Sequence, residues 1–249
     1  MANALRTRLS EEALLGTFVK LPRPEVVDVV ALAGFDFFVL DLEHGQSSYA
    51  EARETLGAAR AAGVDAVVRI GVLDTALANR LLEAGAAGIQ LSTVTSVTLA
   101  RGLRAALRYQ PLGERSISLA QPAARYGATA LSDYLAEFGE HPLVVGQFET
   151  VRYDDPIADI ASHLDIAFIG PTDLSVAAGT PGSLDEGAAA EVIAQVESAA
   201  HSGAQLGTFV ASPTAARDAF ARGYRYVLLA SDLAVLGSAL RDGVAEVRA

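Results

Sequence analysis

The stretch from Phe35 to Gly45, FDFFVLDLEHG, decides the fold. It begins as an apolar and aromatic run, which is typical of a strand covered on both faces in a parallel sheet, and it ends with Asp41, Glu43 and His44. Polar groups on such a strand belong where it leaves the core, because burying an unpaired charge is costly. In α/β enzymes the active site lies at this end of the strands. The stretch therefore predicts both a parallel sheet and the position of a functional site.

The same alternation of short apolar segments and helical segments continues on both sides of this stretch. Seven further strands are predicted at residues 14–20, 65–70, 87–94, 143–149, 166–170, 205–211 and 226–230. Helices are predicted from proline starts, serine caps and glycine stops at residues 24–34, 47–63, 75–83, 96–109, 133–138, near 156–157, at 186–200, at 213–222 and from 233 to the C-terminus. Residues 110–131 fit neither period, and this length indicates a functional loop or an inserted helix.

Eight strands that alternate with helices in 249 residues have the length and rhythm of a (β/α)8 TIM barrel. The alternative is a doubly wound open sheet, which usually has a glycine-rich phosphate turn after its first strand. This chain has Lys20-Leu21-Pro22-Arg23-Pro24 there instead. No change of composition marks a linker, so we expect one α/β domain over residues 1–249, a (β/α)8 barrel.

The composition excludes several classes of protein. Hydrophobic residues make up 51% and charged residues 20%, which is enough apolar material for a sizeable core. The net charge of −11 disfavours binding to nucleic acids or membrane surfaces, because these partners are polyanionic. The absence of cysteine excludes disulfides, a thiolate nucleophile and cysteine-ligated zinc. With no signal peptide and no membrane-spanning apolar run in the sequence, we expect a soluble cytoplasmic protein.

Several predicted strands end in residues that a hydrophobic core would not hold. The carboxyl ends of barrel strands meet on one face, so these residues are candidates for an active site. Gln147 and Glu149 are two positions apart and point to the same side of their strand. The full set is Asp41, Glu43, His44, Arg69, Gln90, Ser92, Gln147 and Glu149, with Thr172 and Asp173 in the turn after residues 166–170.

Glu149 and Asp173 are candidate ligands of a hard divalent cation such as Mg²⁺ or Mn²⁺. Their carboxylates lie on neighbouring strand ends, and two protein ligands leave positions for water and substrate oxygens. The alternative for each carboxylate is a surface ion pair or a helix cap, and Asp173, after Gly170-Pro171-Thr172, is well placed for a cap.

His44 is a candidate general base, and Asp41 could hold its imidazole in one tautomer and raise its basicity. The alternative is a structural histidine. Arg69 ends an apolar strand, where its charge needs an anionic partner: a substrate carboxylate, or an internal pair with Glu43. The remaining histidines lie near helix ends or loops and are expected to be structural: His141, His163 and His201.

On these residues the chain resembles, nearly end to end, the HpcH/HpaI group of metal-dependent class II pyruvate aldolases, which includes 4-hydroxy-2-oxoheptanedioate aldolase. The motifs that carry the resemblance are Gly34-Phe35-Asp36 leading to Asp41-Leu42-Glu43-His44, Val68-Arg69, Arg108-Tyr109 with Pro111 and Gly113-Glu114-Arg115, Gln147-Phe148-Glu149-Thr150, and Gly170-Pro171-Thr172-Asp173-Leu174-Ser175. The chain departs from the family at Ser92, where proline is usual, and at Ser116, where glycine is usual. Both departures are expected where the aldehyde half of a substrate would lie.

The resemblance implies a barrel whose last helix swaps between subunits of a homo-oligomer, a trimer or a hexamer built from trimers. It implies that Glu149 and Asp173 bind Mg²⁺, Mn²⁺ or Co²⁺, and that Gln147 lies beside the metal and the substrate. The backbone N–H groups of Thr172 and Asp173 would hold the carboxylate of pyruvate.

The resemblance also implies roles for the residues after the predicted strands at 35–45 and 65–70. Arg69 would face the keto oxygen and the enolate. His44, oriented by Asp41, would be the acid/base through a metal-bound water. Apart from the resemblance, we expect Glu43 to be a partner of the metal's water molecules or of Arg69.

The implied activity is the reversible cleavage of a 4-hydroxy-2-oxo acid into pyruvate, or a close 2-oxo acid, and an aldehyde. A divalent cation and Arg69 would stabilise the pyruvate enolate without a Schiff base. Lys20 is the one lysine at a predicted strand end, and a class I mechanism through it is an alternative. Decarboxylation of oxaloacetate through the same enolate is a second alternative. A third is a non-catalytic barrel that serves as a binding or assembly subunit.

Overall fold

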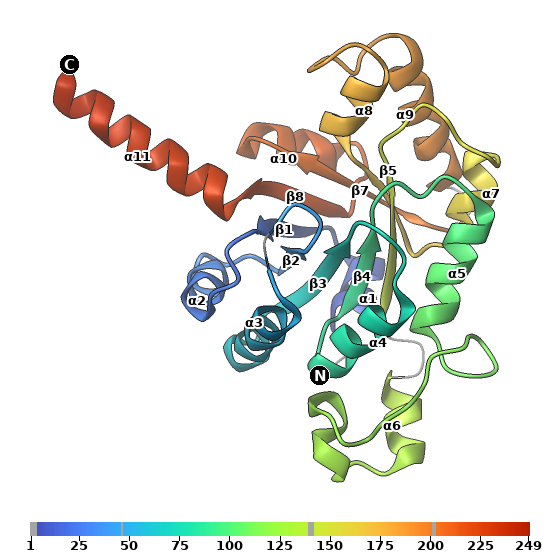
Figure 1. The fold of residues 1–249 in the computed structure, drawn as a ribbon. Coiled ribbons are helices and arrows are strands. Elements are labelled where there is room, and N and C mark those ends of the chain that lie inside the picture. The colour runs from blue at the N-terminus through green and yellow to red at the C-terminus, as the bar shows by residue number, and fades with distance from the viewer. Residues whose placement is uncertain (1–3, 46, 139–141, 201–202) are drawn as a thin grey trace.

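The computed structural model describes residues 4–45, 47–138, 142–200 and 203–249. Eight parallel strands pair in sequence order and close into a barrel, which confirms the predicted (β/α)8 fold and excludes the open sheet (Figure 1). The strands are β1 (Leu14–Val19), β2 (Phe37–Asp41), β3 (Asp65–Ile70), β4 (Gly88–Leu91), β5 (Leu143–Phe148), β6 (Ile166–Ile169), β7 (Gln205–Val210) and β8 (Tyr226–Ser231).

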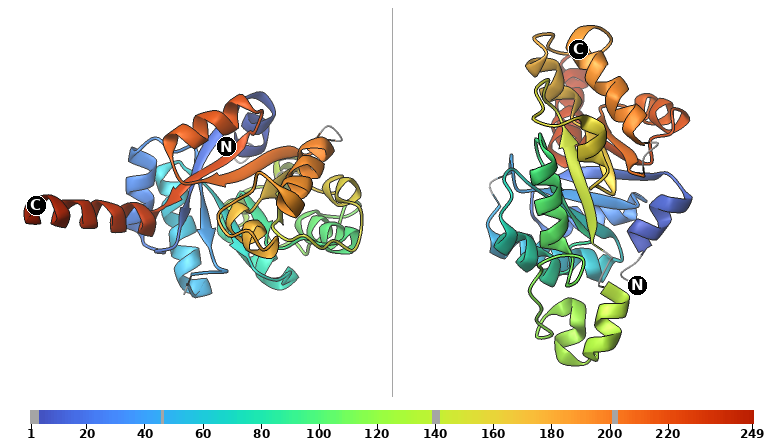
Figure 2. Two further views of the ribbon diagram at one scale, coloured as in Figure 1. Left: turned by 90° about the horizontal axis from the view of Figure 1, so that it is seen from above. Right: turned by 90° about the vertical axis from the view of Figure 1, so that its right-hand side faces the viewer.

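Helices surround the barrel, as the views from above and from the side show (Figure 2). Those that follow strands at the predicted places are α2 (Pro24–Leu32), α3 (Tyr49–Ala62), α4 (Thr75–Ala84), α5 (Val97–Leu107), α7 (Ile157–Ala161), α9 (Gly187–Ala199), α10 (Pro213–Ala221) and α11 (Asp232–Arg248). The sequence signals explain their ends: Ser48 and Glu51 form a capping box at the start of α3, and Gly63 closes it in the left-handed region with φ of 72°.

The sequence did not predict helix α1 (Ala4–Glu11) or the short helix α8 (Pro171–Ala177), which replaces the turn expected after β6. Leu5 and Leu9 of α1 pack with the inward-facing residues of the strands, so α1 closes the amino end of the barrel. Within the unassigned segment 110–131 the structure has a short 3-10 helix, η1 (Pro122–Gly127), followed by α6 (Leu131–Phe138). This segment and α6 lie below the barrel in Figure 1.

Alternation along the strands separates two cores. On β2, Phe37 and Val39 point into the barrel, whereas Phe38 and Leu40 pack against the surrounding helices. Continuing this alternation places Asp41 on the inner side at the carboxyl end of β2. The register of β2 and β3 pairs Asp41 with Arg69, so the two charged residues meet inside the barrel mouth.

Helix α11 differs from the other helices because it extends away from the barrel (Figures 1 and 2). None of its residues is buried. Its exposed apolar side chains include those of Leu236, Leu240 and Val244, which repeat at a spacing of four residues along one face. No helix in the part of the chain that the structure describes is both long enough and apolar enough to cross a membrane.

Candidate active site

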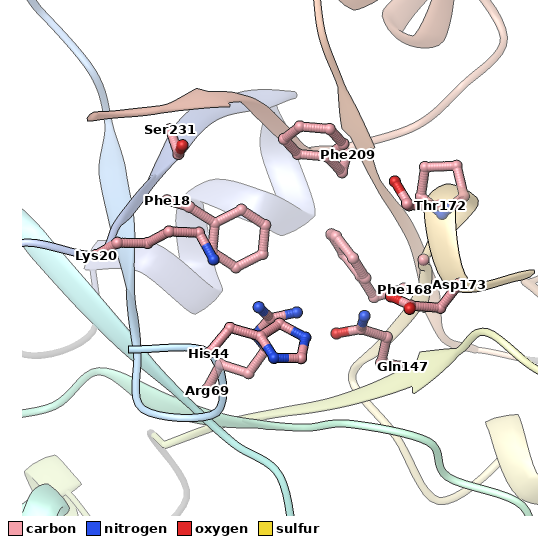
Figure 3. Close-up of a pocket in the computed structure, with 12 residues that line it drawn as sticks. Phe18, Lys20, His44, Arg69, Gln147, Phe168, Thr172, Asp173, Phe209 and Ser231 are labelled. Atoms are coloured by element: carbon pink, nitrogen blue, oxygen red, sulfur yellow. The ribbon is translucent and has the colours of Figure 1, made fainter. Parts of the chain in front are cut away.

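A cavity of about 260 Å³ opens at the carboxyl end of the barrel (Figure 3). The side chains of Phe18, Phe168 and Phe209 form its apolar wall. Its polar lining includes Lys20, His44, Arg69, Gln147, Thr172, Asp173 and Ser231. The structure thus brings five of the predicted site residues together in one cavity, and Asp41, Glu43 and Glu149 contact residues of its lining.

Asp41 and Arg69 form a buried ion pair beneath this cavity. The Nε and Nη2 groups of Arg69 donate to the two carboxylate oxygens of Asp41 at 3.0 and 2.7 Å, and Lys20 Nζ donates to the same carboxylate at 2.6 Å. Burial alone raises the pKa of Asp41, but the hydrogen bonds and charge of Arg69, together with Lys20, outweigh burial and hold the pKa well below its usual range. Asp41 is therefore an anion that orients two cations.

The contact expected between Asp41 and the imidazole of His44 is not formed, and this prediction is corrected. Asp41 instead accepts the backbone N–H groups of Glu43 and His44 at 3.1 and 3.2 Å. Its oxygens are occupied by Arg69 and Lys20 inside the barrel, whereas the imidazole lies in the loop after β2 and its side chain is 56% exposed. Asp41 therefore shapes the loop that carries His44 and does not set the tautomer of its ring.

Glu43 lies between Arg69 and His44. Its Oε2 atom is 3.4 Å from Arg69 Nε and 3.7 Å from His44 Nε2, and it accepts a hydrogen bond from Ser92 Oγ at 2.5 Å. The predicted pair between Glu43 and Arg69 is present, and it lies beside the stronger pair with Asp41. Ser92 thus holds Glu43 in this position.

Glu149 is 7% exposed, and it is held by Thr93, which the sequence did not single out, and by Gln147. The backbone N–H and hydroxyl of Thr93 donate to Glu149 Oε1 at 2.8 and 2.6 Å, and the amide of Gln147 donates to Oε2. Burial raises the pKa of Glu149, the hydrogen bond from Thr93 opposes this, and the charges of Asp173 and Glu43 raise it further. The only sequence signal for a role of Thr93 at the site was its position directly after the polar end of β4.

The amide of Gln147 is oriented by a buried chain of hydrogen bonds. Gln90 Nε2 donates to Gln147 Oε1 at 2.8 Å, and Tyr226 Oη donates to Gln90 Oε1 at 3.3 Å. Gln147 therefore turns its N–H group towards Glu149. Gln90, predicted as a polar strand end, acts inside the barrel beneath the cavity.

The residues around Glu149 and Asp173 fit a hard divalent cation. The two carboxylates are oxygen donors of the kind that Mg²⁺ and Mn²⁺ prefer. A Cβ on Gly170 would lie 2.7 Å from Glu149 Oε2 and 2.8 Å from Gln147 Nε2, so only glycine leaves room for these side chains. Asp173 is exposed in the first turn of α8, and no side chain caps that helix, which removes the capping alternative.

The carboxylates do not form a complete cage. Among the described residues, no three histidine, aspartate or glutamate side chains are grouped so that they could hold a metal ion by themselves. A cation bound by Glu149 and Asp173 would therefore leave positions for substrate oxygens and water. Burial is the main cause of the raised pKa of Glu149, and the charges of Asp173 and Glu43 add to it; such a cation would offset this negative charge.

Other predicted residues lie outside the cavity. Ser116 accepts a hydrogen bond from Asn79 on α4 at 2.9 Å and is not among the residues that line this cavity, and its expected place near the aldehyde stays a prediction. His163 lies in the turn between α7 and β6, and its structural role stays a prediction. His141 and His201 lie outside the described residues.

Comparisons with known proteins find similar sequences and a similar fold. The sequence profile of the HpcH/HpaI aldolase/citrate lyase family matches residues 14–239. The hydroxypyruvate/pyruvate aldolase of Rhizorhabdus wittichii is 34% identical over 99% of both chains, and the 5-keto-4-deoxy-D-glucarate aldolase of Shigella dysenteriae is 29% identical over 92% of this chain and 90% of the relative. The crystal structure of an HpcH/HpaI aldolase from Desulfitobacterium hafniense superposes with a TM-score of 0.91 and 29% identity, and covers 98% of this chain and 96% of that one.

Proposed function

Because the chain belongs to the HpcH/HpaI aldolase/citrate lyase family, we propose that it cleaves a 4-hydroxy-2-oxo acid reversibly into pyruvate, or a close 2-oxo acid, and an aldehyde. The protein is an enzyme, a carbon–carbon lyase of the aldolase type. The observation that carries the proposal is the position of Arg69, which Asp41 orients at the wall of a cavity that also contains Gln147 and Asp173.

The 2-oxo acid would bind at the β5 and β6 side of the cavity. Glu149 and Asp173 would hold the divalent cation, with Gln147 beside it. When bound, the cation supplies positive charge that stabilises negative charge on the keto oxygen. The backbone N–H groups of Thr172 and Asp173 precede the first helical hydrogen bond of α8, which Leu174 makes to Gly170, so they remain able to donate to a carboxylate.

Arg69 would stabilise the enolate that cleavage produces. Breaking the C3–C4 bond leaves the electron pair on the pyruvate half, and its oxygen becomes negative. A guanidinium has five N–H donors, and the contacts of Nε and Nη2 with Asp41 leave others that can reach the cavity. Since Asp41 already holds Arg69 in place, little reorganisation is required as the charge develops.

His44 would transfer the proton of the C4 hydroxyl. Its imidazole borders the cavity and is more than half exposed, so it can take this proton during cleavage and return it during synthesis. Glu43, at 3.7 Å, would stabilise the protonated ring.

The location of the protein, predicted to be cytoplasmic, stays a prediction.

The test is an assay of pyruvate formation with metal-free protein. Protein treated with EDTA should be inactive towards 4-hydroxy-2-oxo acids, and Mg²⁺, Mn²⁺ or Co²⁺ should restore activity. Glu149→Gln keeps the size of the side chain, and in this variant added metal should not restore activity. Full activity after complete removal of metal would refute the class II mechanism. Release of pyruvate from oxaloacetate but not from 4-hydroxy-2-oxo acids would favour the decarboxylase alternative.

We also propose that the protein forms a homo-oligomer, a trimer or a hexamer, through helix α11. The support is an extended helix with no buried residue and an apolar face that includes Leu236 and Leu240. A second copy of the chain would cover this face, because a helix of this kind gains stability only by burying it. Light scattering of Leu236→Asp and of the exposed control Arg241→Asp should show dissociation only in the first variant.

A further inference from the structure

Lys20 lies on the side of the cavity away from Gln147, Thr172 and Asp173 (Figure 3). It follows β1, and its ammonium group points towards the centre of the cavity, near Phe18 and His44. The side chain is 26% exposed, although its partner Asp41 is completely buried. Lys20 is therefore a cation at the boundary between the buried ion pair and the cavity.

The ammonium group of Lys20 has hydrogen-bonding capacity that the described contacts do not use. It carries three N–H donors, and the structure shows one side-chain bond, to Asp41 at 2.6 Å. Asp41 is shared with Arg69, so a single carboxylate faces two cations. An ammonium held in an ion pair with a buried carboxylate is also a poor nucleophile, which argues against the class I alternative.

The position of Lys20 is fixed by its backbone. The carboxylate of Asp232, the first residue of α11, accepts the N–H groups of Lys20 and Leu21 at 3.0 and 2.9 Å. Next to it, Ser231 Oγ accepts the N–H group of Ala234, which leaves its own O–H free to donate. Lys20 and Ser231 therefore place polar hydrogens on a side of the cavity that is otherwise lined by aromatic side chains.

We propose that Lys20 selects the aldehyde: it binds an oxygen substituent, hydroxyl or carboxylate, on the carbon next to the aldehyde carbonyl. This inference rests on the proposed function, because it assigns the β5 and β6 side of the cavity to the 2-oxo acid. With the keto oxygen at Arg69, the new bond extends towards His44 and Lys20. An N–H donor with a positive charge then stabilises acceptors that carry an oxygen over apolar acceptors of the same size.

The test compares aldehydes of matched size in aldol synthesis with pyruvate. Glycolaldehyde is compared with propanal, and glyoxylate with 2-methylpropanal. The wild type should prefer the oxygenated member of each pair by roughly 10- to 100-fold in kcat/KM, the range expected for one hydrogen bond to a charged group. Lys20→Met should reduce both preferences to about threefold or less, and Lys20→Arg should retain most of them. A loss for glyoxylate alone would identify the carboxylate as the group bound, and a loss for glycolaldehyde alone the hydroxyl.

A second measurement separates this inference from the proposed function. Exchange of the methyl protons of pyruvate in D2O, with metal and without aldehyde, reports on enolate formation alone. Lys20→Met should exchange within about threefold of the wild type if it keeps its melting temperature, since Arg69 retains its two bonds to Asp41. The matched control is Arg23→Met, because Arg23 is exposed and pairs with Glu51 outside the cavity.

The outcomes are distinct. No exchange in the wild type would refute the proposed function itself. Unchanged aldehyde preferences in Lys20→Met, or loss of exchange in this variant, would overturn the assignment of Lys20 to the aldehyde. A wild type that shows no preference within either pair would overturn it without any variant, even if Lys20→Met did not fold.

Discussion

The two ends of the barrel each contain an ion pair between a buried arginine and an aspartate, and the pairs differ in their surroundings. At the carboxyl end, Arg69 is 6% exposed, pairs with Asp41 and borders the cavity. At the amino end, Arg108 is 1% exposed and donates to Asp165 at 3.2 Å and to the carbonyl of Pro142 at 2.6 Å. The pair of Arg69 and Asp41 thus borders a cavity that a ligand can enter, whereas the side chain of Arg108 is enclosed by the protein.

The partners of each aspartate show the same difference. Asp165 also accepts the backbone N–H of Val144 and the guanidinium of Arg6, so it connects α1, α5 and the amino ends of β5 and β6. Burial lowers the pKa of Arg108 to about 10, and the charge of Asp165 opposes this shift. Asp41, in contrast, shares its charge between Arg69 and Lys20, two cavity residues. Similar ion pairs thus connect helices and strands at the amino end of the barrel, and hold charged side chains at the cavity at the carboxyl end.

The largest effect is expected from Arg69→Ala, which breaks the pair at the carboxyl end. This change removes the proposed donor to the enolate and should lower kcat/KM for retro-aldol cleavage by about 10³-fold. It also leaves Asp41 buried with Lys20 as the remaining cation, so the free energy of unfolding should fall by about 3 kcal/mol. Arg69→Lys should restore part of the stability and little of the activity, because lysine cannot form the bidentate pair. Near-normal turnover in Arg69→Ala would refute the role of Arg69.

The pair at the amino end should separate stability from activity. Arg108→Met leaves Asp165 and the carbonyl of Pro142 with one donor fewer, and should lower the free energy of unfolding by about 3 kcal/mol in urea denaturation. The kcat/KM of the folded fraction should stay within about twofold of the wild type. Arg101→Met, at an exposed arginine of the same helix, is the control and should change neither quantity. A selective loss of activity in Arg108→Met would contradict the comparison.

Most of the barrel could be predicted from the sequence because each strand carries a local signal. The apolar runs, the glycines after helices and the prolines at helix starts place all eight strands and the surrounding helices within a few residues. Helix α1 was missed because only Leu5 and Leu9 contact the core, and the rest of it is polar. Helix α8 was missed because seven residues are too few for a periodic pattern.

Much of the membership of the cavity was predictable, but most contacts within it were not. The inward alternation of each strand is enough to identify Asp41, Arg69 and Gln147 as residues of the barrel mouth. Which charges meet depends instead on the register between strands and on the length of each side chain. The register of β2 and β3 places Arg69 against Asp41, and the sequence offered only Glu43 or a substrate as its partner. Thr93 was not predicted because its role depends on a bend of the backbone.

The smallest effect is expected from a change at Thr93. This residue tests whether Glu149 at the carboxyl end of the barrel depends on neighbouring hydrogen-bond donors, as Asp165 does at the amino end. Its φ of 49° lies in the left-handed region, which is unfavourable for a residue branched at Cβ. This conformation directs both its N–H and its hydroxyl at Glu149 Oε1. The bend therefore positions a proposed metal ligand.

Removing the hydroxyl while keeping the backbone should weaken metal binding without affecting the fold. In Thr93→Ala the Kd for Mn²⁺, followed by electron paramagnetic resonance of the free ion, should rise about 10-fold, the lower limit for a group that supports a metal ligand. Thr93→Ser keeps the hydroxyl and should remain within about twofold of the wild type. Since Thr93 contacts neither Asp41 nor Arg69 in the described hydrogen bonds, stability in urea should change by less than about 1 kcal/mol. Equal affinity in the alanine and serine variants would show that the backbone N–H alone positions Glu149.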